Sequence, residues 1–409
     1  MNLRYLATTV AFLATGFIVP NASAEEASPV VKITPSGQYM ARARFSQNKD
    51  FASDTNRESV RHRARLGLKF DFGPTLSTFV QVQDVRVWGE ETNTLGDFSA
   101  DGLDLHQGYL DAKHENGFRL RIGRQEIAYL NHRLIGTVGF VEQARSFDAI
   151  RISYTPADSP LVADFFYARL VDNIPAASTA SDNLFAGMAT YTANPAFIPS
   201  VTVVADTSAA DIDRTRVTVG VHVKGKVDSG LHYEVEGYYQ AGSMAGDVSI
   251  AAWMAAANAK YAFGGEMKPF VKLFGEFLSG DDDPTDADIK SFDTLFATNH
   301  KFYGEMDFFL NIPGNTGQRG LMDVGLAAGL QPLPELAAMV TFHNFQAMDD
   351  QGGAAAMGQE IDTKLVLKPM KHLSLDFVYG VFLPGDGNPA GNGDPDVEHF
   401  FYTTVNAKF

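Results

Sequence analysis

The chain of 409 residues contains no cysteine, and outside its N-terminus it contains no run of about 18 apolar residues. The first absence excludes disulfides, thiolate metal sites and a cysteine nucleophile, and it is typical of chains that cross an oxidising compartment. The second absence argues against helical membrane spans. The formal net charge of -16 argues against nucleic acid as a partner.

Arginine is scarce in the second half of the chain. Of 18 arginines, only Arg214, Arg216 and Arg319 follow Arg169. Acidic residues cluster instead in loop-like sequence, so a negative total charge is compatible with a positively charged interior. The acidic stretch 280–288 only loosely resembles a calcium loop, and we expect a solvated loop there. We expect no metal site, no cofactor and no catalytic residue.

The stretch 60–72 carries the clearest pattern in the sequence. Its odd positions include Arg61, Arg63, Arg65 and Lys69, whereas its even positions are nearly all apolar. Successive side chains of a β-strand point to opposite faces, so a strand here has one cationic face and one apolar face. An alternation this long and this sharp is typical of a membrane barrel, with lipid outside and water inside.

Similar alternation predicts strands along most of the chain. The turn His114-Glu115-Asn116-Gly117 predicts a tight hairpin. Polar residues change parity at Gln83-Asp84, which predicts a bulge in that strand, and residues 172–198 read as a long loop or inward-folded segment. We expect strands at residues 39–45, 60–72, 78–88, 105–113, 118–124, 149–154, 162–170, 216–224, 233–240, 249–261, 268–278, 321–330, 336–345, 361–368, 373–382 and 399–409.

Both ends of the sequence fit a barrel that is exported from the cytoplasm. Arg4, the apolar stretch 6–19 and Ala22-Ser23-Ala24 predict a cleaved signal peptide at residues 1–24. Alternating residues of the last strand end at Phe409, which resembles the signal read by the barrel-assembly machinery. We therefore expect that machinery, outer-membrane lipid and lipopolysaccharide as partners.

These observations predict an all-β protein. It is an antiparallel transmembrane β-barrel of about 18 strands (16–18), formed by residues 25–409 as a single domain in the bacterial outer membrane. Short and long connections alternate, as expected for short periplasmic turns and longer outer loops.

Arginines at inward parity are the candidate pore-lining residues. Beside Arg61, Arg63 and Arg65, the strand patterns place Arg42, Arg44, Arg119 and Arg121 inside. A guanidinium keeps its charge and offers several donors, so a ring of them would favour anions. Two interpretations remain open. The arginines either make the lumen anion-selective or pair with acidic residues and hold the wall together.

Three stretches resemble the alginate-export family of outer-membrane porins. They are RHRARLGLKF with FVQVQDVRVWGE, LHQGYLDAK with LRIGRQEIAYLNHRLIGTVGF and RSFDAIRI, and FGEFLSGDDDPTDADIKSFDTLFATNHKFYGEMDFF. The resemblance implies an 18-stranded monomeric barrel with an arginine-rich constriction that passes a polyuronate outward. It also implies lumen positions for Arg61, Arg63, Arg65, Arg86, Arg124, Arg133 and Arg151, with Asp84, Glu126 and Asp148 as their acidic partners.

The predicted function is therefore a passive outer-membrane channel for anionic or sugar-acid solutes, small or oligosaccharide. The alternatives are a general porin without chemical preference, a barrel blocked by its own loops, and an outer-membrane enzyme. An enzyme of the lipase type needs a Ser–His pair on the exterior. His62 has lipid-facing parity, but the sequence assigns it no serine partner.

Overall fold

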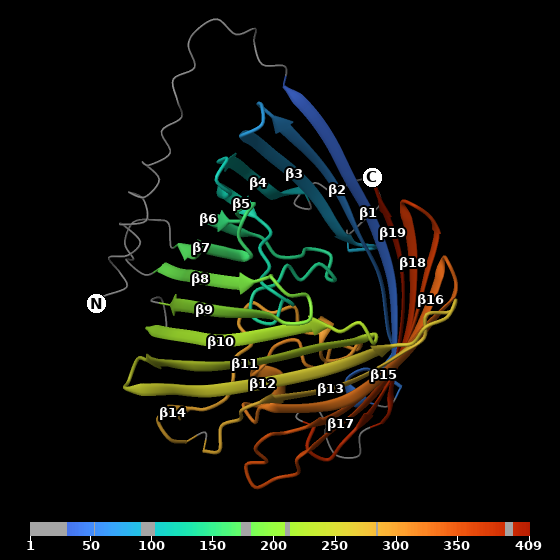
Figure 1. The fold of residues 1–409 in the computed structure, drawn as a ribbon. Coiled ribbons are helices and arrows are strands. Elements are labelled where there is room, and N and C mark those ends of the chain that lie inside the picture. The colour runs from blue at the N-terminus through green and yellow to red at the C-terminus, as the bar shows by residue number, and fades with distance from the viewer. Residues whose placement is uncertain are drawn as a thin grey trace, which may run out of the picture.

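The computed structural model describes residues 31–52, 54–90, 103–172, 181–208, 213–283, 285–388 and 396–409. Within them the chain forms one closed antiparallel β-barrel of 18 strands, as predicted, and a two-residue strand, β14 (Asp288–Ile289), lies in a loop (Figure 1). The predicted signal peptide, residues 1–24, lies outside the described residues.

The barrel strands follow one another around the wall in chain order. The first nine are β1 (Lys32–Gln47), β2 (Arg57–Asp71), β3 (Leu76–Val87), β4 (Leu103–Lys113), β5 (Phe118–Gln125), β6 (Phe147–Tyr154), β7 (Leu161–Asp172), β8 (Ser181–Tyr191) and β9 (Ile198–Ser208). The other nine are β10 (Arg214–Lys226), β11 (Leu231–Met244), β12 (Val248–Ala262), β13 (Phe270–Leu278), β15 (Leu321–Leu333), β16 (Leu336–Gln346), β17 (Ala356–Met370), β18 (Leu373–Pro384) and β19 (Glu398–Lys408).

The barrel closes between its first and last strands. β1 pairs with both β2 and β19, and the backbone N–H of Phe409 donates to the Gly37 carbonyl at 3.1 Å. Closure removes the free sheet edges, so the backbone groups of the wall find their partners within the wall. The predicted C-terminal strand is thus the strand that completes the barrel.

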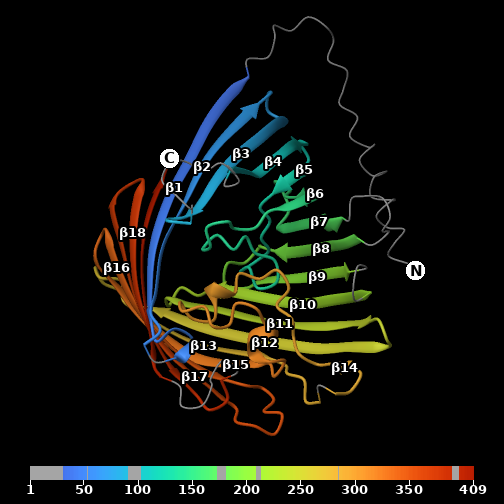
Figure 2. The ribbon, with the colours of Figure 1, turned by 180° about the vertical axis from the view of Figure 1, so that it is seen from behind.

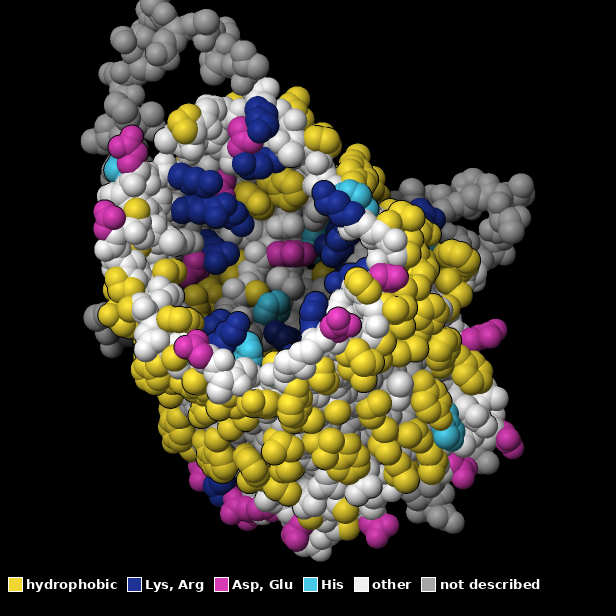
Figure 3. Space-filling model, turned by 45° about the vertical axis from the view of Figure 1, so that its right-hand side comes forward, with side chains coloured by type: hydrophobic (Ala, Val, Ile, Leu, Met, Phe, Trp, Pro, Cys, Tyr) yellow, Lys and Arg dark blue, Asp and Glu magenta, His cyan; other side chains and the backbone are white. Residues whose placement is uncertain are grey.

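Alternation sorts the side chains of the wall as the sequence predicts. On β2, Leu66 is 52% exposed toward the outside, whereas Arg63 is 3% exposed. Hydrophobic side chains form a broad band on the part of the outer surface that Figure 3 shows. A hydrocarbon layer can accommodate such a band, because no unpaired polar group has to enter it.

Short turns join the strands at one end and longer connections join them at the other. The hairpin predicted at 114–117 is present, with Gly117 at φ 93°, a value that glycine adopts without strain. Two long connections fold back into the barrel (Figures 1 and 2). They are the first inward segment, residues 126–146, and the second inward segment, residues 279–320.

Helical structure in the described residues consists of the 3-10 helices η3 (Lys49–Phe51), η4 (Asn299–Lys301) and η5 (Gly314–Thr316). No helix in this part of the chain is long and apolar enough to cross a membrane.

Two local predictions were wrong. Residues 172–198, expected as a loop, contain strand β8, and the inward side chains of this strand, Leu184 and Ala186, pack on the apolar core of the inward segments. Because both faces of β8 are apolar, its sequence does not alternate. The bulge expected at Gln83-Asp84 lies instead on β4, where His106 is the extra residue between the pairs Gln81–Gln107 and Val82–Leu105.

Candidate functional site in the barrel lumen

The two inward segments pack against each other inside the barrel. Residues Ile135 and Phe296 form a parallel bridge, and the Gly136 N–H donates to the Phe296 carbonyl at 2.8 Å. Side chains of both segments, including Ile127, Phe292 and Ile312, are buried with the inner faces of nearby strands. The part of the lumen that these segments occupy is thus a hydrophobic core, which narrows the space open to a solute.

Arg133 fixes the first inward segment to the barrel wall. Its guanidinium lies 2.7 Å from a Glu276 oxygen on β13 and 3.0 Å from a Glu236 oxygen on β11, and it stacks 3.5 Å from the Phe302 ring centroid. Burial alone would lower the pKa of Arg133, but the charges of Glu276 and Glu236 raise it well above its usual value. This arginine, predicted to line the pore, is a fully engaged anchor.

Glu142 of the same segment is the shared acidic partner of three arginines of β1 and β2. Its carboxylate, 1% exposed, lies 3.0 Å from Arg42, 3.8 Å from Arg44 and 3.9 Å from Arg61. Arg63 donates at 3.0 Å to the carbonyl oxygens of Val141 and Glu142. These four arginines face the lumen as predicted, and they bind the inward segment.

Most of the remaining inward arginines also have acidic partners; Arg145 instead donates to the Gly136 and Ala297 carbonyls. Arg65 pairs with Glu126 at 3.2 Å, and Glu126 accepts a second contact from His106 at 2.7 Å. Arg119 and Arg121 share Asp111 at 2.5 and 2.8 Å, and Arg151 pairs with Asp164 at 2.9 Å. The interpretation of the arginines as a lattice that holds the wall together is therefore the one that the geometry supports.

Four predicted lumen residues lie on the opposite face of the wall. Cross-strand partners share a face, and Asp84 and Arg86 pair with the outward residues Ala64 and His62. Arg86 and Asp84 contact each other at 3.0 Å there. In the same way, Arg124 and Asp148 pair with each other and share the face of Ile122 and Ile150. Apart from these four, the predicted positions lie on the lumen side.

Four basic side chains of β10 to β13 differ from the lumen arginines, because none of them has an acidic partner within 4 Å among the described residues. The register aligns Lys226, His232, Lys260 and Lys272 side by side across β10, β11, β12 and β13. We call this set the lysine row. Among the described residues, none of the four forms an ion pair. Figure 3 shows the hollow mouth of the barrel lined with lysine and arginine.

The backbone of the second inward segment rests on two acidic side chains of β17. The N–H groups of Met306 and Glu305 donate to Glu360 at 2.9 Å and to Asp362 at 3.2 Å. Gly304, at φ 85°, comes so close that an added Cβ would lie 2.3 Å from the Glu360 carboxylate. Only glycine allows this approach without displacement.

A second anchor of this segment is a titratable cluster. His300 lies 2.5 Å from Asp307 and 3.4 Å from Glu305, and Glu305 pairs with Lys364 of β17 at 2.7 Å. Burial alone would raise the pKa of Glu305, but the His300 hydrogen bond and the Lys364 charge lower it to about 2. Burial alone would lower the pKa of His300, but the charge of Asp307 raises it above its usual 6.5.

These opposite shifts predict how the anchor depends on pH. The contribution of ionised Glu305 to the stability of the anchored segment is complete above about pH 4.5 and is lost as the pH falls toward 2. The His300 contribution is complete below about pH 6.5 and is lost as the pH rises through the folded-state pKa. We expect amide hydrogen exchange in residues 299–307 to be slowest between these limits, after correction for intrinsic rates. Replacing His300 by glutamine should flatten the alkaline side. It should also move the acidic side to higher pH, because the His300 hydrogen bond helps to lower the pKa of Glu305. An unchanged alkaline side would contradict the assignment.

In the acidic stretch 280–288, the carboxylates hydrogen-bond within the loop. Asp281 accepts the N–H groups of Asp283 and Lys290, and the Lys290 ammonium contacts Asp282 at 2.5 Å. Within the described residues, no group of three or more His, Asp or Glu is placed to hold a metal ion.

The fold and the lumen define the class of protein, a β-barrel of the outer-membrane porin type. Three solved structures share the fold. OccAB1 of Acinetobacter baumannii is 15% identical, with a TM-score of 0.66 over 94% of this chain and 99% of that one. OpdO of Pseudomonas aeruginosa is 14% identical, with a TM-score of 0.61 over 92% and 97%. The outer membrane protein opdK of Pseudomonas aeruginosa is 10% identical, with a TM-score of 0.59 over 92% and 98%.

At these identities the likeness shows the fold alone. No curated protein matches the sequence. The family model described as Alginate export matches residues 33–399, so the chain belongs to the alginate export family, as the sequence resemblance indicated. The family and the fold together indicate a channel rather than an enzyme.

Sequence reasoning missed several residues that shape the lumen. Glu142, Asp164 and Glu236 were not among the predicted partners of arginine, and the lysine row was not among the predicted pore-lining residues. Inward parity marks Lys260 and Lys272, so a count of all inward cations would have found them. Nothing in the sequence pairs Glu142 with β1, because a loop residue has no parity.

Proposed function

We propose that this protein is a passive outer-membrane channel for anionic solutes, including sugar acids, and that its anion preference resides in lysines. The lysine row carries the proposal. Most inward arginines have a buried carboxylate as ion-pair partner, whereas among the described residues no carboxylate lies within 4 Å of the lysines of the row. Lining cations favour anions, because they replace part of the hydration shell of a passing carboxylate. The family name points to a polyuronate as one such solute.

We also propose how the chain reaches its place. A signal peptide at residues 1–24 directs export, and the assembly machinery recognises the last strand, which ends at Phe409. Lipid and lipopolysaccharide then surround the apolar band seen in Figure 3.

A reversal potential in a planar bilayer under a salt gradient tests the proposed selectivity. We expect the refolded protein to prefer chloride, and the double variant Lys260→Gln/Lys272→Gln to lose most of that preference. Lys69→Gln is the matched control, because Lys69 also faces the lumen but pairs with Asp71 at 2.5 Å. A double variant as selective as the unmodified protein would contradict the proposal.

A second candidate function is a barrel blocked by its own loops. The apolar core formed by the inward segments favours it, because water and ions avoid such a region. Absence of any conductance in the same bilayer experiment would support this candidate.

A further inference from the structure

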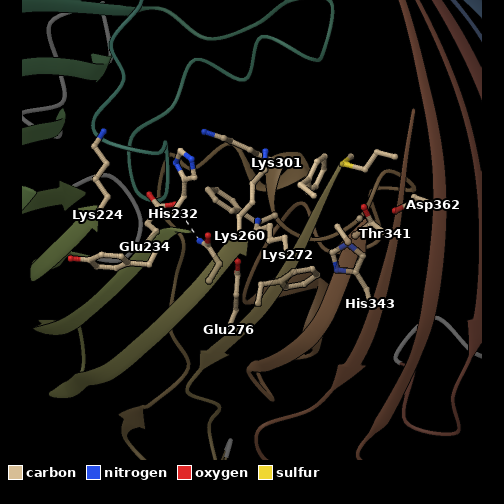
Figure 4. Close-up of a pocket in the computed structure, with 18 of the residues that line it drawn as sticks. Lys224, His232, Glu234, Lys260, Lys272, Glu276, Lys301, Thr341, His343 and Asp362 are labelled. Carbon is tan, nitrogen blue, oxygen red and sulfur yellow. Dashed lines mark hydrogen bonds between the residues drawn. The ribbon is translucent and has the colours of Figure 1, made fainter. Parts of the chain in front are cut away.

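A cavity of about 680 Å³ lies between the lysine row and the second inward segment. Strands β10–β13, β15 and β16 form its wall, and residues 300–305 cover it (Figure 4). The inference drawn from this cavity rests on the proposed function and concerns the chemical class of solute that the channel prefers.

One side of the cavity carries positive charge. Lys260 and Lys272 are direct cross-strand partners, and among the described residues neither has an acidic partner within 4 Å. Two like charges side by side repel each other, and a bound anion would relieve this repulsion. Lys226 and His232 extend the row, which spans roughly 14 Å at the usual strand spacing. Lys301 adds a fifth basic side chain from the inward segment, and its ammonium donates to the Asn131 carbonyl at 2.9 Å.

The cavity also has an apolar side, which lies next to the charges. Phe270, Phe274 and Phe302 contribute aromatic rings, and Ala327 and Met339 contribute aliphatic surface. The Lys260 ammonium lies 4.0 Å from the Phe270 ring centroid. A flat apolar ring that carries an anionic group could therefore contact rings and ammonium groups together.

The carboxylates that could accept hydrogen bonds from sugar hydroxyl groups in this cavity are engaged by other residues, and Asn258 and Thr341 are among its other side chains with an acceptor oxygen. Glu234 is engaged by His222 at 2.6 Å and Asn258 at 3.2 Å, and Glu276 is engaged by Arg133. Glu305 is held by Lys364, and Asp362 accepts a backbone N–H while its other oxygen is buried. A uronate would leave hydroxyl groups poorly paired here, and each unpaired group costs binding energy.

We propose that the cavity is a binding site for carboxylates with an apolar ring, such as an aromatic acid, and that it prefers them over hydroxylated sugar acids of the same charge. The carboxylate contacts the ammonium groups of Lys260 and Lys272, and the ring lies against Phe270 and Phe274. The preference comes from the apolar side, because both ligand types offer the same carboxylate to the lysines.

Two monocarboxylates of equal charge, benzoate and glucuronate, test the proposal. Each is added at the short-turn mouth of the reconstituted channel, and its block of the small-ion current is titrated. Binding to the purified barrel in detergent is measured by calorimetry in parallel. We expect half-maximal block by benzoate at a concentration about tenfold below that of glucuronate.

Two sets of variants separate charge from ring contact. Lys260→Gln/Lys272→Gln should weaken both ligands, and Phe270→Leu should weaken benzoate alone. Phe79→Leu is the matched aromatic control, because Phe79 packs against Tyr109 on the wall of β3 and β4, away from the cavity. Equal affinity for the two acids, tighter binding of glucuronate, or no binding of either would overturn the inference.

The two measurements also separate this inference from the proposed function. Preferential binding of benzoate by a barrel that does not conduct would support the site and refute the channel. An anion-selective current with no preference between the two acids would support the channel and refute the site.

Discussion

Replacement of Arg133 by glutamine should release the first inward segment from the wall and raise the single-channel conductance. The change leaves Glu236 and Glu276 buried without their cation, at 4% and 6% exposure. Removing one partner of a buried ion pair costs about 3–5 kcal/mol, because the remaining charge loses its compensation. The population of the released segment should thus rise by about two to four orders of magnitude.

Two measurements check this expectation. Single-channel recordings report the wider lumen, and limited proteolysis reports exposure of residues 126–146. Arg124→Gln is the matched control, because Arg124 pairs with Asp148 on the outer face, where 37% and 62% of the two side chains are exposed. Exposed pairs contribute about 0–1 kcal/mol, so the control should conduct like the unmodified protein. Equal conductance and equal proteolysis of the two variants would show that Arg133 does not anchor the segment.

The second large effect is expected from Glu142→Gln. Glu142 is the ion-pair partner of Arg42, Arg44 and Arg61, and none of these guanidinium groups can lose its proton at accessible pH. The variant therefore removes the one negative charge that these three guanidinium groups share, and the lumen becomes more positive by one charge. We expect the reversal potential to shift further toward the chloride limit, and the shift should shrink as the salt concentration rises.

The segment should stay in place in this variant, because other contacts hold it. Arg42 still donates to the Phe140 carbonyl at 2.8 Å, and Arg63 still donates to the carbonyls of Val141 and Glu142. Glu115→Gln, in the exposed β4–β5 turn, removes one negative charge elsewhere and should leave the selectivity unchanged. A lumen that becomes no more anion-selective after Glu142→Gln would argue that Glu142 does not set the charge balance of the arginines.

Local patterns predicted the wall of the barrel. One face of each strand of a membrane barrel contacts lipid and the other faces the interior. The sequences of β2 and β10 therefore alternate between apolar and polar residues with a period of two. The prediction fails where the interior is not aqueous. Strand β8 packs Leu184 on the inward segments, so its two faces look alike. It also fails at the loop-side end of β3 and β5, where Asp84, Arg86 and Arg124 are polar although they face outward.

The sequence by itself determined the class of fold, the inward position of most arginines and the family. Only the tertiary structure decided which charges are free. Arg42 and Glu142 are 100 residues apart in the sequence, and Arg133 and Glu236 are 103 residues apart, so no local sequence pattern predicts these ion pairs. The lysine row joins residues of four strands, and the sheet register alone brings them together. A cation can bind a solute or pair with a carboxylate of the barrel wall, and the distance to its nearest carboxylate decides between the two. The folded chain sets that distance.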